Sequence, residues 1–101
     1  MIRVRFQTDG DDRITGFHLS GHAGAGEHGH DIVCAAVSSA AYMAANTITE
    51  IVQAPVNVTV NDGLMDLTVL DRIDRCQDIL SGFQLHIQAL AEQYPKRIQL
   101  N

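Results

Sequence analysis

Cysteine is scarce in this chain, which contains only Cys34 and Cys76 among its 101 residues. No apolar run in the sequence approaches the roughly 20 residues that a bilayer-crossing helix needs. The first residues, MIRVRFQ, alternate in polarity, whereas a secretory signal peptide has a continuous apolar stretch. We therefore expect a cytoplasmic protein without a membrane segment, in which both cysteines are free thiols rather than partners in a disulfide.

Positive charge is also scarce, because 7 Lys and Arg residues stand against 12 Asp and Glu residues and the net charge is −5 with histidine neutral. Proteins that bind nucleic acids need clustered Lys and Arg side chains to neutralise phosphates. The composition therefore argues against direct nucleic-acid binding. A mild excess of acid is compatible with a basic protein or peptide partner, although solubility alone is its commoner role.

The length of the chain suits one domain with a single hydrophobic core. Apolar residues make up 46 % of the sequence and charged residues 19 %, which is an ordinary globular balance and not that of a disordered chain. We therefore expect one folded domain over residues 1–101.

Alternating polarity predicts two pairs of strands. Residues 2–8 and about 13–20 form the first pair around an Asp-Gly-Asp-Asp turn, with a bulge near Gly16 because the apolar residues of the second strand break parity. Residues 56–61 and 64–70 form the second pair, joined by the hairpin signal Asn-Asp-Gly at 61–63. A short last strand is expected at Ile98 and Leu100.

Two segments are predicted to be helical. The first runs from Asp31, a suitable N-cap, to about Gln53, and its few polar positions predict burial on most sides. The second spans about 72–94, and its apolar residues recur every three or four positions along a narrow seam that includes Cys76. The order ββαββαβ predicts an α+β fold of two layers, with both helices on one face of a mostly antiparallel sheet.

Glycine and histidine are concentrated just before the first helix. Residues 21–30 lack apolar periodicity and are expected to form a loop that contains Gly24, Gly26 and Gly29. Four of the five histidines lie in or beside this loop, at His18, His22, His28 and His30. Such a loop beside a site is able to close over a bound peptide and exclude water.

Cys34 falls in the first turn of the predicted helix if Asp31 is its N-cap. The unpaired N–H groups and partial positive charge of a helix start favour a thiolate, which is the nucleophilic form of cysteine. The same N–H groups, including that of Cys34, are candidate donors to an oxyanion.

A cysteine nucleophile in acyl transfer also needs a base that later protonates the leaving amine. We select His22 because it follows the end of the second strand, which is a firmer anchor than the loop. Asp31 either orients His22 or only caps the helix. Ser38 lies one turn after Cys34 on the same side, where it either supports the site or bonds back to a backbone carbonyl.

The stretch SGHAGAGEHGHDIVCAAVSSAA, residues 20–41, resembles the signature of the ribosomal-processing cysteine protease family. The resemblance implies a cytosolic bacterial endopeptidase that is often dimeric and needs no cofactor. Its implied substrate is the N-terminal extension of the large-subunit ribosomal protein L twenty-seven, an apolar, aromatic-containing peptide ahead of a basic stretch. The nucleophile of the family falls on Cys34 and its base on His22, and Asp31 and Ser38 also match the motif.

Two other functions are compatible with the same residues. His22, His28, His30 and Cys34 offer imidazole and thiolate ligands to zinc, although their spacing is not a usual zinc-finger pattern. The apolar first helix and Leu85 also fit a non-catalytic, ribosome-associated interaction protein.

Overall fold

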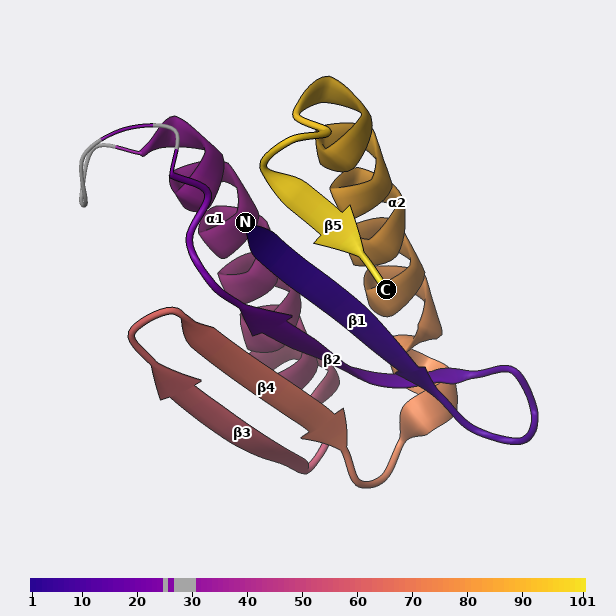
Figure 1. Ribbon diagram of the computed structural model, residues 1–101. Helices are drawn as coiled ribbons and strands as arrows, with labels where there is room; N and C mark the ends of the chain where they lie inside the picture. The colour runs from indigo at the N-terminus through magenta and orange to yellow at the C-terminus, as the bar shows by residue number, and fades with distance from the viewer. Residues whose placement is uncertain (25, 27–30) are drawn as a thin grey trace.

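A computed structural model describes residues 1–24, 26 and 31–101 (Figure 1). The elements follow in the order β1 (Ile2–Thr8), β2 (Ile14–Ser20), α1 (Ile32–Asn46), the π-helical η1 (Thr47–Val52), β3 (Val56–Asn61), β4 (Leu64–Val69), the 3₁₀ turn η2 (Ile73–Cys76), α2 (Gln77–Gln93) and β5 (Ile98–Leu100). Both helices lie on one face of the sheet (Figure 1). The predicted α+β class, element order and two-layer arrangement are confirmed.

The sheet has the strand order β3-β4-β2-β1-β5, and β1 and β5 form its parallel pair while the other neighbours are antiparallel. In this order β4 pairs with β2, which brings the end of β2 next to the β3–β4 turn. The backbone N–H of Gly21 donates to the carbonyl oxygen of Gly63 at 2.9 Å and joins the two segments. The loop that follows β2 therefore starts beside the hairpin turn of a distant part of the sequence.

The predicted bulge in β2 is present. Gln7 pairs with Gly16 and Thr8 pairs with Ile14, so Thr15 is an extra residue on the β2 side. The bulge lets Ile14 and Phe17 both face the core, where they are 7 % and 0 % exposed. Gly16 is required here, because a Cβ at this position would lie 2.1 Å from the carbonyl oxygen of Leu67.

Helix α1 is less buried than the sequence predicted. Its buried residues are Val33, Val37, Ala41, Ala44 and Ala45. Ile32, Tyr42 and Met43 are 70 %, 47 % and 53 % exposed, so the expectation of burial on most sides is wrong. A two-layer fold covers a helix from the sheet and from its helical neighbour, and the outer side of the helix remains open to solvent.

The 21 residues of α1 and η1, Ile32–Val52, are long and apolar enough by length and composition to cross a membrane. The expectation that no segment approaches this limit is therefore wrong. The core helix of a domain meets the same criteria, and α1 packs its buried residues into the core of this domain. Alanine-rich helices reach a high apolar content because close packing against a sheet favours small side chains.

The second helix follows its predicted seam, with Leu80, Phe83, Ile87 and Leu90 buried. Three aromatic rings join it to the first hairpin, because Phe83 lies 4.8 Å from Phe17 and 5.5 Å from Phe6 between ring centroids. Both pairs have edge-to-face geometry, which aromatic quadrupoles favour. Leu85, which falls off the seam, is 68 % exposed.

Candidate active site

Asp31 begins α1 as the sequence predicted. Its backbone is extended, with φ −81° and ψ 109°, and its carboxylate accepts hydrogen bonds from the N–H groups of Val33 at 2.9 Å and Cys34 at 3.0 Å. Asp31 is 9 % exposed, so this capping interaction is shielded from water. Capping therefore fixes the first turn of the helix and places Cys34 within it.

The backbone N–H of Cys34 already has a hydrogen-bond acceptor, so the expectation that it binds an oxyanion needs correction. Because it donates to Asp31, it is not the open oxyanion donor that a bare helix start predicts. A different backbone group faces the thiol: the N–H of Ala23 donates to Cys34 Sγ at 3.2 Å. Ala23 lies three residues beyond Ser20, the last residue of β2, so the segment after this strand rather than the helix supplies the donor.

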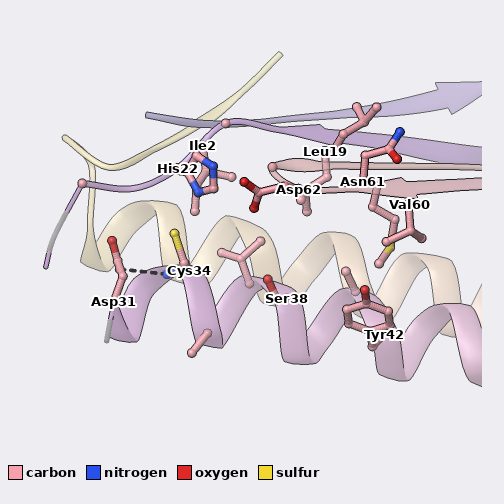
Figure 2. Close-up of a pocket in the computed structure, with 18 of the residues that line it drawn as sticks. Ile2, Leu19, His22, Asp31, Cys34, Ser38, Tyr42, Val60, Asn61 and Asp62 are labelled. Atoms are coloured by element: carbon pink, nitrogen blue, oxygen red, sulfur yellow. Dashed lines mark hydrogen bonds between the residues drawn. The ribbon is translucent and has the colours of Figure 1, made fainter. Parts of the chain in front are cut away.

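His22 directly precedes Ala23, so its imidazole and the Ala23 N–H come from the same short segment. Figure 2 shows the imidazole and the sulfur of Cys34 at one end of the cleft, facing each other from its two walls. The imidazole rests on the β3–β4 turn, because a Cβ added to Gly63 would lie 2.9 Å from His22 Nε2. The structure thus brings together the two side chains that the sequence selected as nucleophile and base.

A cleft of about 790 Å³ extends from these two residues between α1 and the β3–β4 hairpin. Ser38 and Tyr42 follow Cys34 along α1 at intervals of one turn and line one wall (Figure 2). Val60 and Met65 contribute apolar surface from the hairpin. The predicted position of Ser38, on the same side of the helix as Cys34, is confirmed.

The glycine-rich segment is described in part. Gly24 and Gly26 line the cleft beside His22. Gly24 has a φ of +69°, a left-handed conformation that glycine adopts without strain. Gly29, His28 and His30 lie outside the described residues, so the closing of this loop over a substrate stays a prediction.

The remaining described histidines lie away from the thiol. His18 faces the outer side of the sheet, where its Nδ1 is 3.4 Å from the Asp66 carboxylate. His86 lines a separate groove between α1 and α2 with Met43 and Gly82. Within residues 1–24, 26 and 31–101, no group of three or more His, Cys, Asp or Glu side chains is arranged to hold a metal ion. A zinc site would therefore have to draw on histidines of the loop.

The two thiols differ in environment. Cys34 is half-buried at the cleft, whereas Cys76 is completely buried. Burial raises the pKa of the Cys76 thiol, since the apolar core disfavours a thiolate. Cys76 is therefore part of the core, as the sequence predicted, and Cys34 is the cysteine that a substrate is able to reach.

Gly63→Ala is expected to reduce both stability and activity. Gly63 has a φ of +69°, and a methyl group there meets the His22 ring, so we expect a loss of about 1–2 kcal/mol together with displacement of the imidazole. Thermal unfolding and peptide cleavage measure the two effects. Gly82→Ala is the control, because its Cβ meets nothing within 4 Å on α2 and alanine favours helix. Equal activity of the Gly63 variant and wild type would contradict this arrangement.

Comparisons with known proteins identify the family of this chain. The family model described as cysteine protease Prp matches residues 1–99. This chain belongs to the cysteine protease Prp family. A Prp relative from Staphylococcus aureus, named ribosomal processing cysteine protease, is 32 % identical over 104 residues, covering 100 % of this chain and 98 % of that relative. The chain is accordingly a cysteine protease.

Solved Prp structures have the same fold. A crystal structure of S. aureus Prp with a covalently linked product peptide superimposes with a TM-score of 0.93 at 31 % identity, covering 100 % of this chain and 98 % of that chain. A second S. aureus Prp structure, in complex with a substrate peptide, gives a TM-score of 0.87 at 30 % identity with the same coverage.

Sequence reasoning missed three parts of the cleft. Ala23 contributes a backbone N–H, for which a side-chain motif gives no signal. Gly63 was recognised as a turn residue, but its contact with His22 depends on the pairing of β2 with β4. The apolar surfaces of Tyr42 on α1 and Val60 on β3 line the same cleft from positions 18 residues apart, and no local pattern relates them.

Proposed function

We propose that this protease is an endopeptidase that removes the N-terminal extension of the large-subunit ribosomal protein L twenty-seven during ribosome assembly. The observation that carries the proposal is the meeting of Cys34, His22 and the Ala23 N–H at one end of a peptide-sized cleft. The name of the S. aureus relative and its peptide complexes support a ribosomal protein segment as the substrate class.

In the acylation step we assign Cys34 as nucleophile and His22 as general acid. The Cys34 thiolate attacks the scissile carbonyl carbon, and an S–C bond forms as the carbonyl oxygen becomes an oxyanion. His22 in its imidazolium form then donates its proton to the amide nitrogen. The C–N bond breaks, the downstream peptide leaves as an amine, and the upstream peptide remains as a thioester on Cys34.

Hydrolysis of the thioester uses the same two residues. Neutral His22 removes a proton from water while the water oxygen attacks the thioester carbon. The C–S bond then breaks and releases the upstream peptide as an acid, with Cys34 again a thiolate and His22 protonated. His22 is exposed to solvent, so water reaches it without rearrangement of the described core.

The shape of the cleft supports an extended peptide as its ligand. Tyr42 lies eight residues beyond Cys34, a separation of about 12 Å along an α-helix. An extended peptide covers this distance with roughly three or four residues. The walls there include Tyr42, Val60 and Met65, and they favour apolar side chains such as the resemblance implies for the L twenty-seven extension.

Tyr42→Ala is expected to lower kcat/KM for an extension peptide by about 10-fold, because the cleft loses aromatic contact with the substrate. The protein should remain folded, since Tyr42 is 47 % exposed. Steady-state cleavage kinetics measure the effect. Met43→Ala is the matched control: Met43 is the next residue, is similarly exposed and lines the groove on the other side of α1. A larger effect at Met43 than at Tyr42 would contradict this binding path.

Peptide cleavage with mass detection tests the function itself. The substrate is a synthetic peptide that contains the L twenty-seven extension and the first residues of the mature protein, and the control is a peptide of the same composition in scrambled order. We expect one cut at the junction and no cut in the scrambled peptide. Binding without cleavage would instead indicate an interaction protein, and stoichiometric zinc in the purified protein would indicate a metal site.

The proposal includes a cytoplasmic location and a homodimer. A reducing cytoplasm keeps the thiol of a cysteine nucleophile from forming a disulfide. The net charge of −5 suits a substrate that contains a basic stretch, as the resemblance implies for L twenty-seven. Light scattering combined with size-exclusion chromatography tests the dimer by its mass.

A further inference from the structure

The segment that carries His22 and Ala23 is held from a distant part of the chain. The guanidinium of Arg97 donates through Nη1 to the carbonyl oxygen of Gly24 at 2.7 Å and to that of Ala23 at 3.3 Å. More than 70 residues separate Arg97 from both partners in the sequence. The contact therefore links the turn after α2 to the strand end that meets the nucleophile.

Arg97 is itself anchored to the sheet. Its backbone N–H donates to the carbonyl oxygen of Tyr94 at 3.0 Å, and its carbonyl oxygen accepts from the N–H of Ile2 at 2.8 Å. The next residue, Ile98, pairs with Ile2 in the parallel β1–β5 ladder and is buried. The guanidinium thus extends to the loop from a backbone position that is fixed by the fold.

Gly24 is held by Arg97 at a point where the chain has no side chain of its own. It has no side chain to pack and adopts a left-handed conformation. Ala23 contributes only a small buried methyl group, yet its N–H must point at Cys34 Sγ. The two carbonyl groups bound by Arg97 belong to the two peptide units that directly follow the Ala23 N–H. By holding these units, the guanidinium restricts how the chain turns at Ala23 and therefore the orientation of the N–H that faces the sulfur.

We propose that Arg97 is a positioning residue for the nucleophile: by binding the carbonyl groups of Ala23 and Gly24, it holds the Ala23 N–H against Cys34 Sγ. This inference rests on the proposed function. Asp31 fixes the helical turn that carries Cys34, and Arg97 fixes the backbone segment that faces it. Small displacements of groups around a reacting atom reduce rate far more than they reduce stability.

Arginine suits this task better than lysine. Its planar guanidinium presents several N–H donors in a fixed arrangement, whereas a lysine ammonium is a compact charge on a flexible stem. A lysine at position 97 is therefore expected to hold the two carbonyl groups less firmly than arginine does. Arg97 and Gly24 are both exposed, so water is able to reach the Gly24 carbonyl oxygen when the guanidinium is removed.

The test compares Arg97→Ala and Arg97→Lys with wild type, and uses Lys96→Ala as control because Lys96 is an exposed cation in the same turn. We expect Arg97→Ala to lower kcat roughly 10- to 100-fold with KM within about twofold. Arg97→Lys should fall between Arg97→Ala and wild type, and Lys96→Ala should match wild type. Millimolar guanidinium ion should restore part of the kcat of Arg97→Ala. The midpoint of thermal unfolding should change little in all three variants.

A second readout does not depend on peptide cleavage. The rate of Cys34 alkylation by iodoacetamide at neutral pH should be several-fold lower in Arg97→Ala than in wild type, because the sulfur loses a positioned N–H donor. If wild type cleaves no peptide but Arg97→Ala slows alkylation, the proposed function fails and the positioning role stands. If kcat and alkylation rate of Arg97→Ala both equal those of wild type, or if Lys96→Ala reproduces its losses, the positioning role is overturned.

Discussion

Cys34→Ala is expected to abolish cleavage of the extension peptide, with a loss of roughly 10⁴-fold or more in kcat. Alanine has no sulfur to form the thioester, and no other described cysteine reaches the cleft because Cys76 is completely buried. The fold should be retained, since Cys34 is half-buried and the Asp31 cap uses the backbone N–H of residue 34 rather than its side chain. Mass-detected cleavage and thermal unfolding measure the two parts of this expectation.

Cys76→Ala provides the matched control for the same chemical change. The variant loses packing in the core and should be less stable by about 1–2 kcal/mol, but it should cleave the peptide at the wild-type rate. Burial raises the pKa of the Cys76 thiol, which further separates this residue from nucleophilic chemistry. Cleavage by Cys34→Ala would show that another group is the nucleophile and would end the present assignment.

His22→Ala is expected to reduce kcat by about 10³-fold with a small change in stability. The imidazole is exposed at the cleft and rests on Gly63, so its removal takes away proton transfer while leaving the core intact. Cleavage kinetics measure the loss, and added imidazole should restore part of it because the vacated space lies at the surface.

His18→Ala is the control for this prediction. His18 lies four residues earlier, but it faces the outer side of the sheet next to Asp66, away from the cleft. The variant should cleave the peptide at the wild-type rate. Equal losses in the two histidine variants would indicate a general effect of the substitutions on β2 and the segment after it, and not a catalytic role for His22.

Local rules were sufficient for much of the fold and for the identity of the central residues. Alternation over 2–8 and 56–61 identified strands, and the Asn-Asp-Gly signal identified the turn at 61–63, because side-chain period and turn geometry depend on near neighbours. The cap at Asp31 and the position of Cys34 in the first turn follow from hydrogen bonds within four residues. The burial of α1 was overestimated, because an alanine-rich sequence does not show how many sides of a helix have neighbours.

The sequence by itself therefore determined the elements, the helix start that carries Cys34, and the family signature that selects His22. Only the tertiary structure decided which groups surround the sulfur. The pairing of β2 with β4 places Gly63 under the His22 ring, and the parallel pairing of β5 with β1 places Arg97 on the carbonyl groups of Ala23 and Gly24. The physical reason is that each contact joins a side chain to the backbone of a residue about 40 to 75 positions away. Their partners are set by strand order and not by any local pattern of side chains.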